Sequence, residues 1–393
     1  MTSDLTSFSP PSRRAGALQE SLIRTVAEKA FGRDDVLALW FGEGRWPTSE
    51  RAVTAAQAAL DAGDHFYHPN HGIPEFRDAI AHYQSQLYGR HLSRRHITVT
   101  ASGMQALALT AQALIDPGDR VLCITPVWPN LPEVFKISGA EVEALALEMC
   151  DGRWHLDLDR LFDRLKQDCK ILLLNSPNNP TGWVMDDKAC AEVMAFCRSR
   201  GIWVVADEVY ARLCRGRTVA PSFQNHADPE DRLISVNSFS KAWSMTGWRL
   251  GWITAPAELQ PIYGALTEFN IASAAGFIQR AGQAMLETGE DEVKSLQTKL
   301  ATAYEVVSRR LRQMDGVDFA DPDGAFYILF SIDGQTDSLK LAQRLVQDFG
   351  LGLAPGAAFG ASAEGHLRLC YAQEADYLNR ACDRLEAALK HFR

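Results

Sequence analysis

The chain has 393 residues, of which 46% are hydrophobic and 23% are charged, and its formal net charge at pH 7 is −9. This composition is typical of a globular protein with room for two domains, and the negative charge argues against nucleic acid or an anionic membrane as the main partner. No apolar run approaches the roughly 20 residues that a membrane-spanning helix needs.

The N-terminal segment, residues 1–14, has no apolar core of the kind found in secretion signals. The eight cysteines of the chain form no C-x-x-C pair, and several lie inside apolar runs. Neither a zinc-like ligand spacing nor an H-E-x-x-H pattern occurs. We therefore expect a cytoplasmic protein with buried free thiols and no metal site.

Between residues 51 and 286, short apolar runs alternate with helical patterns. The helical patterns include residues 74–88, 104–115 and 187–200. The apolar runs cover residues 97–101, 121–125, 142–147, 171–175, 202–206, 233–236 and 250–254. Nearly continuous apolar strands that alternate with helices predict an α/β domain whose mostly parallel central sheet is covered by helices.

The C-terminal part has a different order of elements. Residues 290–314 are typical of one long, charged amphipathic helix. Beyond it we expect strands at residues 317–320, 325–332 and 367–371, and helices near residues 338–349 and 374–390. This order indicates a smaller α+β domain, against which a helix near residues 16–31 can pack. The predicted domains are residues 49–287 for the large one, and residues 1–48 together with 288–393 for the small one.

A glycine-containing turn follows the first predicted strand. Ser102 and Gly103 stand where a helix begins, and the free N–H groups of a helix N-terminus bind anions. Trp128 follows the strand at residues 121–125, where its ring is placed either to stack on another aromatic ring or to pack in the core.

Two further patterns follow buried strands. Asn179 lies in the loop Ser176-Pro-Asn-Asn-Pro-Thr-Gly182, whose prolines and glycine fix the backbone and can present an amide into a crevice. Asp207, in Asp207-Glu-Val-Tyr210, comes at the carboxyl end of a strand, where open α/β sheets bind ligands. An ionised Asp207 needs a cation, and a protonated pyridine nitrogen is one candidate; a cap on the next turn is the structural alternative.

The remaining candidates are a lysine and two arginines. Lys241 lies among small and polar residues in Ser238-Phe-Ser-Lys241, and a buried amine can form an imine with a carbonyl cofactor. Ser238 and Arg249 can hold a phosphate, and Arg368 interrupts an apolar strand, where a buried guanidinium needs a carboxylate. Taken singly, these patterns are also typical of a surface lysine and an internal salt bridge.

Together, the order and separation of these patterns resemble the class I/II aminotransferases, the aspartate-aminotransferase-like branch of pyridoxal-phosphate (PLP) enzymes with fold type I. The resemblance runs from roughly residue 37 to the C-terminus. It includes Gly72-Ile-Pro-Glu-Phe-Arg77, Pro322-Asp-Gly-Ala-Phe-Tyr327 and Pro355-Gly356.

The resemblance implies a role for individual residues around PLP. Lys241 resembles the Schiff-base lysine, and Asp207 the partner of the pyridine nitrogen. Asn179 and Tyr210 resemble the pair that bonds the phenolic oxygen, and Trp128 the residue that stacks on the ring. The residues that resemble the phosphate site are Ser102, Gly103, Met104, Ser238 and Arg249.

The resemblance also implies a substrate site and a dimer. Arg368 resembles the clamp on the substrate α-carboxylate, helped by Asn179 and the backbone of Gly42. Tyr67 resembles a tyrosine that reaches the phosphate of the neighbouring subunit, which implies a homodimer with shared active sites.

The expected activity is ping-pong transamination between an L-amino acid and a 2-oxo acid, with 2-oxoglutarate as the acceptor. Some aspartate-preferring relatives carry a lysine where this chain has Met104, which cannot pair with a second carboxylate. We therefore expect neutral or aromatic donors to be favoured over aspartate. Trp46, Trp128 and Tyr67 are expected to form an aromatic rim of the pocket.

Three alternatives share this fold. C–S lyases and other eliminating enzymes use the same scaffold, as do α-decarboxylases. A PLP-binding transcription regulator needs a DNA-binding module before the aminotransferase part, and only about 40 residues precede that part here.

Overall fold

The computed structural model describes residues 12–18 and 20–392. The helices are α1 Arg13–Gly16, α2 Leu22–Glu28, α3 Glu50–Asp61, α4 Pro74–Tyr88, α5 Gly103–Leu114, α6 Asn130–Ser138, α7 Leu158–Leu165, α8 Asp187–Arg200, α9 Gln260–Glu268, α10 Gly276–Thr288, α11 Glu290–Arg312, α12 Ser338–Phe349 and α13 Ala375–Phe392. The strands are β1 Leu37–Ala38, β2 Ile97–Thr100, β3 Arg120–Thr125, β4 Glu141–Ala146, β5 Glu148–Cys150, β6 Arg153–His155, β7 Ile171–Asn175, β8 Trp203–Asp207, β9 Leu233–Ser238, β10 Gly251–Thr254, β11 Val317–Phe319, β12 Tyr327–Ile332, β13 Leu351–Gly352, β14 Ala354–Pro355 and β15 His366–Cys370.

The central sheet has seven strands in the order β2-β10-β9-β8-β7-β3-β4. Its neighbours pair in parallel, except that β10 is antiparallel to both β2 and β9. Because β10 has an antiparallel partner on each side, β2 runs in the same direction as β9. The carboxyl ends of β2, β9, β8, β7 and β3 therefore meet at one edge of the sheet. The predicted, mostly parallel sheet of an α/β fold is confirmed.

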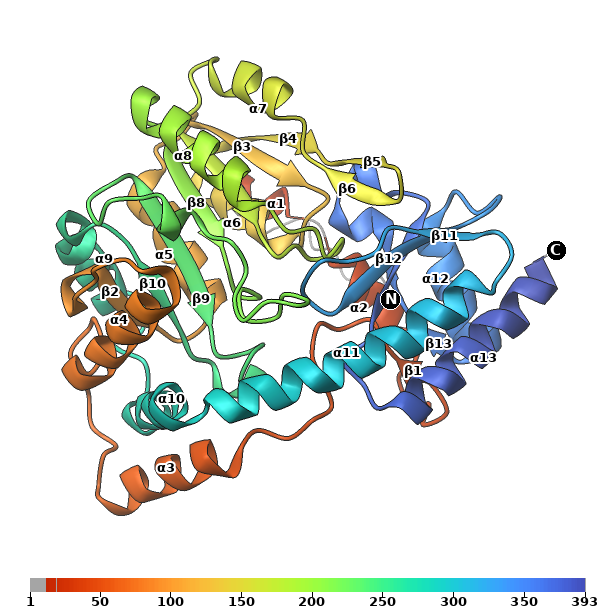
Figure 1. Cartoon of the computed structure of the whole chain (residues 1–393), viewed down its shortest axis with the longest axis horizontal. Helices are drawn as coiled ribbons and strands as arrows, with labels where there is room; N and C mark the ends of the chain where they lie inside the picture. The colour runs from red at the N-terminus through yellow and green to blue at the C-terminus, as the bar shows by residue number, and fades with distance from the viewer. Residues whose placement is uncertain (1–11, 19, 393) are drawn as a thin grey trace, which may run out of the picture.

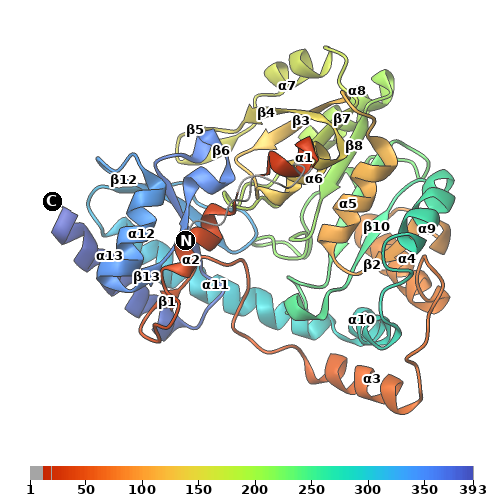
Figure 2. The same cartoon turned by 180° about the vertical axis from the view of Figure 1, so that it is seen from behind.

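The two faces of this sheet are covered by different helices. Along β3, Val121 belongs to an apolar cluster with Leu107 of α5, whereas Leu122 belongs to a second cluster with Val193 of α8. Figure 1 shows α8 in front of the sheet, and Figure 2, turned by 180°, shows α5 in front of it. Successive strand residues point to opposite faces of the sheet. Because helices cover both faces, the residues on both must be apolar, which explains the near-continuous apolar runs in the sequence.

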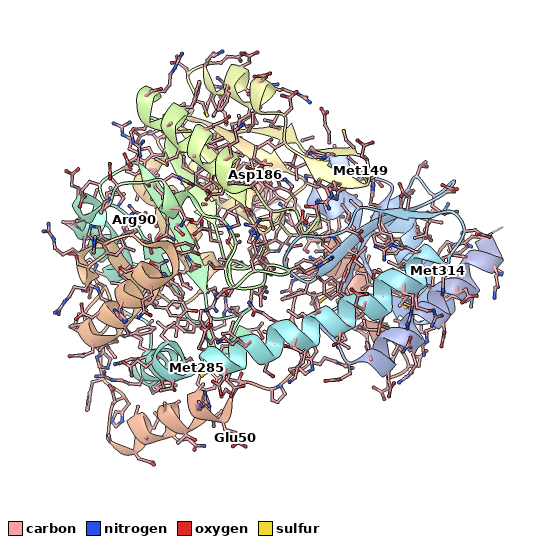
Figure 3. All side chains as sticks on the ribbon, viewed as in Figure 1. Glu50, Arg90, Met149, Asp186, Met285 and Met314 are labelled. Atoms are coloured by element: carbon pink, nitrogen blue, oxygen red, sulfur yellow. The ribbon has the colours of Figure 1, made fainter. Side chains whose placement is uncertain are left out.

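The C-terminal part forms a separate antiparallel sheet in the order β11-β12-β15-β14. The short strand β1 pairs in parallel with β13, which joins the N-terminal segment to this part of the chain. The long helix α11 runs from α10 to α13 (Figure 1), and the buried Met285 and Met314 lie near its two ends (Figure 3). No helix among the described residues is both long and apolar enough to cross a membrane.

The N-terminal helix differs from the prediction. Instead of one helix over residues 16–31, the chain forms the four-residue α1 and the seven-residue α2. Ser21 takes an extended conformation and its side-chain oxygen accepts the N–H of Arg24 at 3.4 Å, so Ser21 caps a new helix. As expected, α2 packs against the C-terminal part, on α12 and β14. Elsewhere α4, α8 and α12 have the predicted bounds.

Gly251, the first residue of β10, allows a close approach of the turn that starts α5. A Cβ atom there would lie 2.7 Å from both the Gly103 nitrogen and the Asn237 carbonyl oxygen. We expect Gly251→Ala to lower the free energy of unfolding by about 1–3 kcal/mol, because backbone atoms must shift. Urea denaturation measures this. In the control Gly247→Ala, the added Cβ meets nothing within 4 Å, and equal losses in the two variants would contradict the packing argument.

Candidate active site

Polar residues from several elements meet at the carboxyl edge of the central sheet. Asn175, Asp207 and Ser238 end β7, β8 and β9, and Gly103 begins α5. They line a cavity of about 550 Å³, whose other walls come from α2, the segment after β1, β12 and β15. Of the predicted site residues, this cavity is lined by Gly42, Gly103, Met104, Trp128, Asn179, Asp207, Tyr210, Ser238, Lys241, Arg249 and Arg368.

Asp207 is a buried carboxyl group, 3% exposed, at the inner end of the cavity wall. Its Oδ1 accepts the N–H of Val209 at 3.3 Å, and its backbone carbonyl accepts the amide of Asn175 at 2.9 Å. Burial raises the pKa of Asp207 to about 7, although the charge of Lys241 opposes this. Among the described residues no ion pair engages Asp207, so a cation in the cavity would stabilise its ionised form.

Lys241 follows β9 and reaches the same cavity. Its Nζ donates a hydrogen bond to the carbonyl oxygen of Gly42 at 2.5 Å. Burial of the amine lowers the pKa of Lys241 to about 8, and the nearby Arg368 contributes in the same direction. A lysine whose pKa is lowered in this way carries a larger neutral, nucleophilic fraction near neutral pH.

Tyr210 and Tyr327 form a buried pair of phenols beside Lys241. Their hydroxyl oxygens lie 2.7 Å apart, and the rings meet edge to face with centroids at 5.7 Å. Burial raises the pKa of both phenols above the ordinary value, so both hydroxyls stay protonated and can donate. Lys241 Nζ lies 5.7 Å from the centroid of the Tyr210 ring.

Arg368 of β15 is a buried cation that its surroundings satisfy only in part. It is 2% exposed, its Nη1 donates to Asn179 Oδ1 at 2.8 Å, and its Nη2 donates to the carbonyl oxygen of Trp40. Its buried Nε has no hydrogen-bond partner among the described residues. A buried guanidinium that lines a cavity and has no carboxylate partner among the described residues is suited to bind one.

The opposite end of the cavity is suited to an anion. Gly103 and Met104 are the first residues of α5, whose N-terminal N–H groups have no helical acceptor. The Ser102 hydroxyl accepts the N–H of Gln105 at 3.0 Å, so it caps the helix, and Ser102 does not line the cavity. The exposed Arg249 donates to the carbonyl oxygen of Thr246 at 2.6 Å and keeps further donors for an anion.

Two residues of the expected aromatic rim lie elsewhere. Tyr67 is 89% exposed and does not line this cavity. Trp46 lines a neighbouring cavity of about 560 Å³, and its indole N–H donates to Glu374. Trp128 does line the predicted site, together with Trp40 and Phe41. The rim is therefore aromatic, but residues directly after β1 supply most of it.

Several cavity residues were not predicted as site residues. The sequence marks Tyr327 only as part of the Pro322–Tyr327 motif. Asn175 ends a buried strand as Asp207 does, and this position is the signal that identifies it. Trp40, Phe41 and Arg24 have no local pattern that marks them. They enter the site because β1 pairs with β13 and α2 packs against α12, contacts between segments more than 300 residues apart.

Comparisons with known proteins agree with this geometry. The chain is 30% identical over 376 residues to the aspartate aminotransferase of Pyrococcus horikoshii, and the aligned region covers 95% of each protein. It is 29% identical to the aromatic-amino-acid aminotransferase 2 of Thermococcus litoralis, over 96% of this chain and 98% of that one. The solved structure of a Thermus thermophilus aspartate aminotransferase single mutant superposes with a TM-score of 0.91 at 30% identity, over 97% of this chain and 100% of that chain. The family model for aminotransferase class I and II matches residues 35–385, and the chain therefore belongs to the class I and II aminotransferases.

Proposed function

We propose that this PLP-dependent aminotransferase transfers the amino group of a neutral or aromatic L-amino acid to 2-oxoglutarate by a ping-pong mechanism. The observation that carries the proposal is that one cavity brings together Lys241, Asp207 and Arg368, three charged groups from β8, β15 and the segment after β9. A proton-transfer base, an anion for a cationic ring and a carboxylate clamp are the groups that this reaction needs.

The residues of the cavity fit PLP. When bound, this cofactor supplies a pyridine ring that stabilises negative charge on the substrate Cα. Asp207, which is buried and forms no ion pair within the described part of the chain, would hold the ring nitrogen, and Asn179 with Tyr210 would bond the phenolic oxygen. Trp128 would cover the ring face. The residues of the cavity that would hold the phosphate are Gly103, Met104, Ser238 and Arg249. Ser102, which we also propose for the phosphate site, lies next to Gly103 outside the lining and would act by capping α5.

The protein's own groups provide binding and proton transfer. Arg368 and Asn179, which are hydrogen-bonded to each other, orient the substrate α-carboxylate. Lys241 Nζ, neutral above its lowered pKa of about 8, takes the proton from the substrate Cα and holds it as an ammonium group, from which the proton would pass to the bound cofactor. The Tyr210 hydroxyl stays protonated and would donate its hydrogen bond to the phenolic oxygen of the cofactor.

The donor preference rests on the apolar lining of the cavity. Met104 lines the cavity together with other large apolar or aromatic residues, Leu107, Trp128, Trp40 and Phe41. The second carboxylate of aspartate would lose water against this surface without gaining a cation there, which is unfavourable. A similar protein from Thermococcus litoralis is named for aromatic amino acids, although other relatives are named for aspartate.

An exposed apolar surface supports a homodimer with shared active sites. The segment of Tyr67 lies against the segment before α10, since the His68 N–H donates to Ser273 Oγ at 3.4 Å. Large apolar side chains exposed on these two segments and on α9 are Phe66, Tyr67, Ile262, Phe269 and Ile271. Such a concentration of exposed apolar side chains indicates a protein interface. Gln105 of α5 donates to Asn270 Oδ1 at 2.6 Å, which joins this surface to the phosphate end of the site.

Two further proposals concern the organisation of the chain. We retain residues 49–287 as the large domain and residues 1–48 with 288–393 as the small one, because the β1–β13 pairing joins the N-terminal segment to the C-terminal part. We also retain a cytoplasmic location. All eight cysteines are free thiols, and all except Cys150 are buried, as suits a reducing compartment.

A donor screen tests the proposed activity. With 2-oxoglutarate as the acceptor, we expect kcat/KM for phenylalanine, leucine or methionine to exceed that for aspartate. Lys241→Ala should lower kcat by about 10²- to 10⁴-fold, because the Cα proton loses its base, whereas Lys188→Ala, an exposed lysine, serves as the control. Formation of the 2-oxo acid product measures both.

Two results would contradict this proposal. An aspartate value above those of all neutral donors would refute the argument from Met104. Release of pyruvate from a sulfur amino acid without any acceptor would favour the C–S lyase alternative.

The lowered pKa of Lys241 has a measurable consequence. In the cofactor-free protein, acetylation of Lys241 by acetic anhydride should rise with pH with a midpoint near 8, because burial disfavours the ammonium form. Asp207→Asn should move the midpoint lower, since the Asp207 carboxylate raises the pKa of Lys241. Peptide mass spectrometry, normalised to an exposed lysine, measures the rate. A midpoint at the ordinary 10.5 would show that Lys241 is not desolvated.

Subunit exchange tests the shared site. Tyr67→Ala and Lys241→Ala remove the two halves of each proposed site, so each variant alone should have little activity. Random exchange at equal amounts makes half of the dimers hybrid, each with one intact site, and should restore about a quarter of the wild-type activity. Absence of recovery, after mass spectrometry has verified the exchange, would place Tyr67 outside the neighbouring site.

A further inference from the structure

The lining of the active-site cavity contains one more cation than a monocarboxylic substrate and PLP use. Its basic side chains are Arg24, Lys241, Arg249 and Arg368. Lys241 donates a hydrogen bond to Gly42, and Arg368 donates hydrogen bonds to Asn179 and Trp40. Arg249 belongs to the proposed phosphate site near the start of α5 and donates to Thr246. The proposed function therefore leaves Arg24 without a role.

Arg24 extends from α2 and is exposed, so its guanidinium lies at the mouth of the cavity. Its backbone N–H donates to Ser21, but among residues 12–18 and 20–392 no ion pair or hydrogen bond engages its guanidinium, although Glu28 lies one turn later on the same helix. Arg24 also borders a second hollow of about 330 Å³, with Trp40 and Phe41 between the two. The guanidinium therefore has room to move and donors to offer.

The acidic groups around the cavity do not occupy Arg24. Asp207 and Glu43 are the carboxylates in the described lining, and neither forms an ion pair with Arg24. Asp207 lies at the buried end of the cavity and is committed to the cofactor ring in the proposed function. Glu43 is exposed and follows Gly42, the acceptor of Lys241.

We propose that Arg24 binds the second carboxylate of a dicarboxylic 2-oxo acid at the mouth of the cavity, while Arg368 binds the first. This inference rests on the proposed function and specifies its acceptor. The apolar wall of Met104, Trp40 and Phe41 lies in the same lining, so a carboxylate reaches a cation only when the chain extends as far as Arg24. We therefore expect the site to favour a five-carbon dicarboxylate over aspartate, whose shorter side chain would leave its carboxylate beside apolar groups. It thereby reconciles a dicarboxylic acceptor with neutral donors.

The experiment compares 2-oxoglutarate with 2-oxovalerate, which has the same five-carbon chain without the second carboxylate. Leucine serves as the common donor for the wild type, Arg24→Gln, Arg24→Lys and the control Lys29→Gln. The control removes an equal charge from the C-cap of α2, outside the cavity lining. Calorimetry on the holoenzyme measures the affinities of glutarate and valerate in parallel.

We expect Arg24→Gln to raise KM for 2-oxoglutarate, and to weaken glutarate binding, by about 10-fold or more, since a charge-assisted hydrogen bond is lost. Values for 2-oxovalerate and valerate should change by less than about 2-fold. Arg24→Lys should restore part of the loss, and Lys29→Gln should match the wild type. An equal loss for both acceptors, or no loss for 2-oxoglutarate, would overturn the role of Arg24.

The two proposals fail in different ways. A wild-type protein that transaminates neither acceptor contradicts the proposed function. In that case the calorimetric affinities still test the role of Arg24. A preference for glutarate over valerate that disappears in Arg24→Gln supports this role, and a wild type without such a preference contradicts it.

Discussion

The burial of opposite charges without direct ion pairs is the constraint on which the site depends. Asp207 and Arg368 are almost fully buried, and Lys241 reaches the same cavity, yet none of the three is paired with another. Because an unpaired buried charge is costly, the protein is stable in this arrangement only where hydrogen bonds compensate in part, as the backbone carbonyls of Gly42 and Trp40 do. The remaining electrostatic need is what a charged cofactor and substrate satisfy.

The sheet topology makes this arrangement possible. Since β7, β8 and β9 run in parallel, their last residues stand side by side at one edge. The same edge receives the N-terminus of α5, which Gly251 allows to lie close against the sheet. An anion site and a carboxylate are thereby held at fixed positions by rigid elements, and such rigid placement is what preorganised binding requires.

The opposite wall comes from the ends of the chain. Arg368 and Tyr327 lie on neighbouring strands of the C-terminal sheet, and Trp40 and Arg24 come from segments that pack against that part. The wall that carries Asp207 and Ser238 is thus built by one sheet and the wall that carries Arg368 by another. Residues on α2 and after β1, Arg24 among them, can therefore change without disturbing the wall that carries Asp207.

The sequence by itself determined the alternation of strands and helices and the α/β class, and it marked many of the residues that line the cavity. Local patterns carried these predictions, because a buried strand is apolar on both faces. Asp207 ends such a strand, and Ser102 and Asn179 lie in the turns that follow two others. The prediction of a single N-terminal helix was wrong, because the side chain of Ser21 caps a new helix within that segment. Trp46, expected at the rim of the site, lines the neighbouring cavity instead. Only the tertiary structure decided that Trp40, Phe41, Tyr327 and Arg24 join Lys241. These contacts link segments far apart in the chain, and their closeness depends on the β1–β13 pairing and on the packing of α2, which no local pattern encodes.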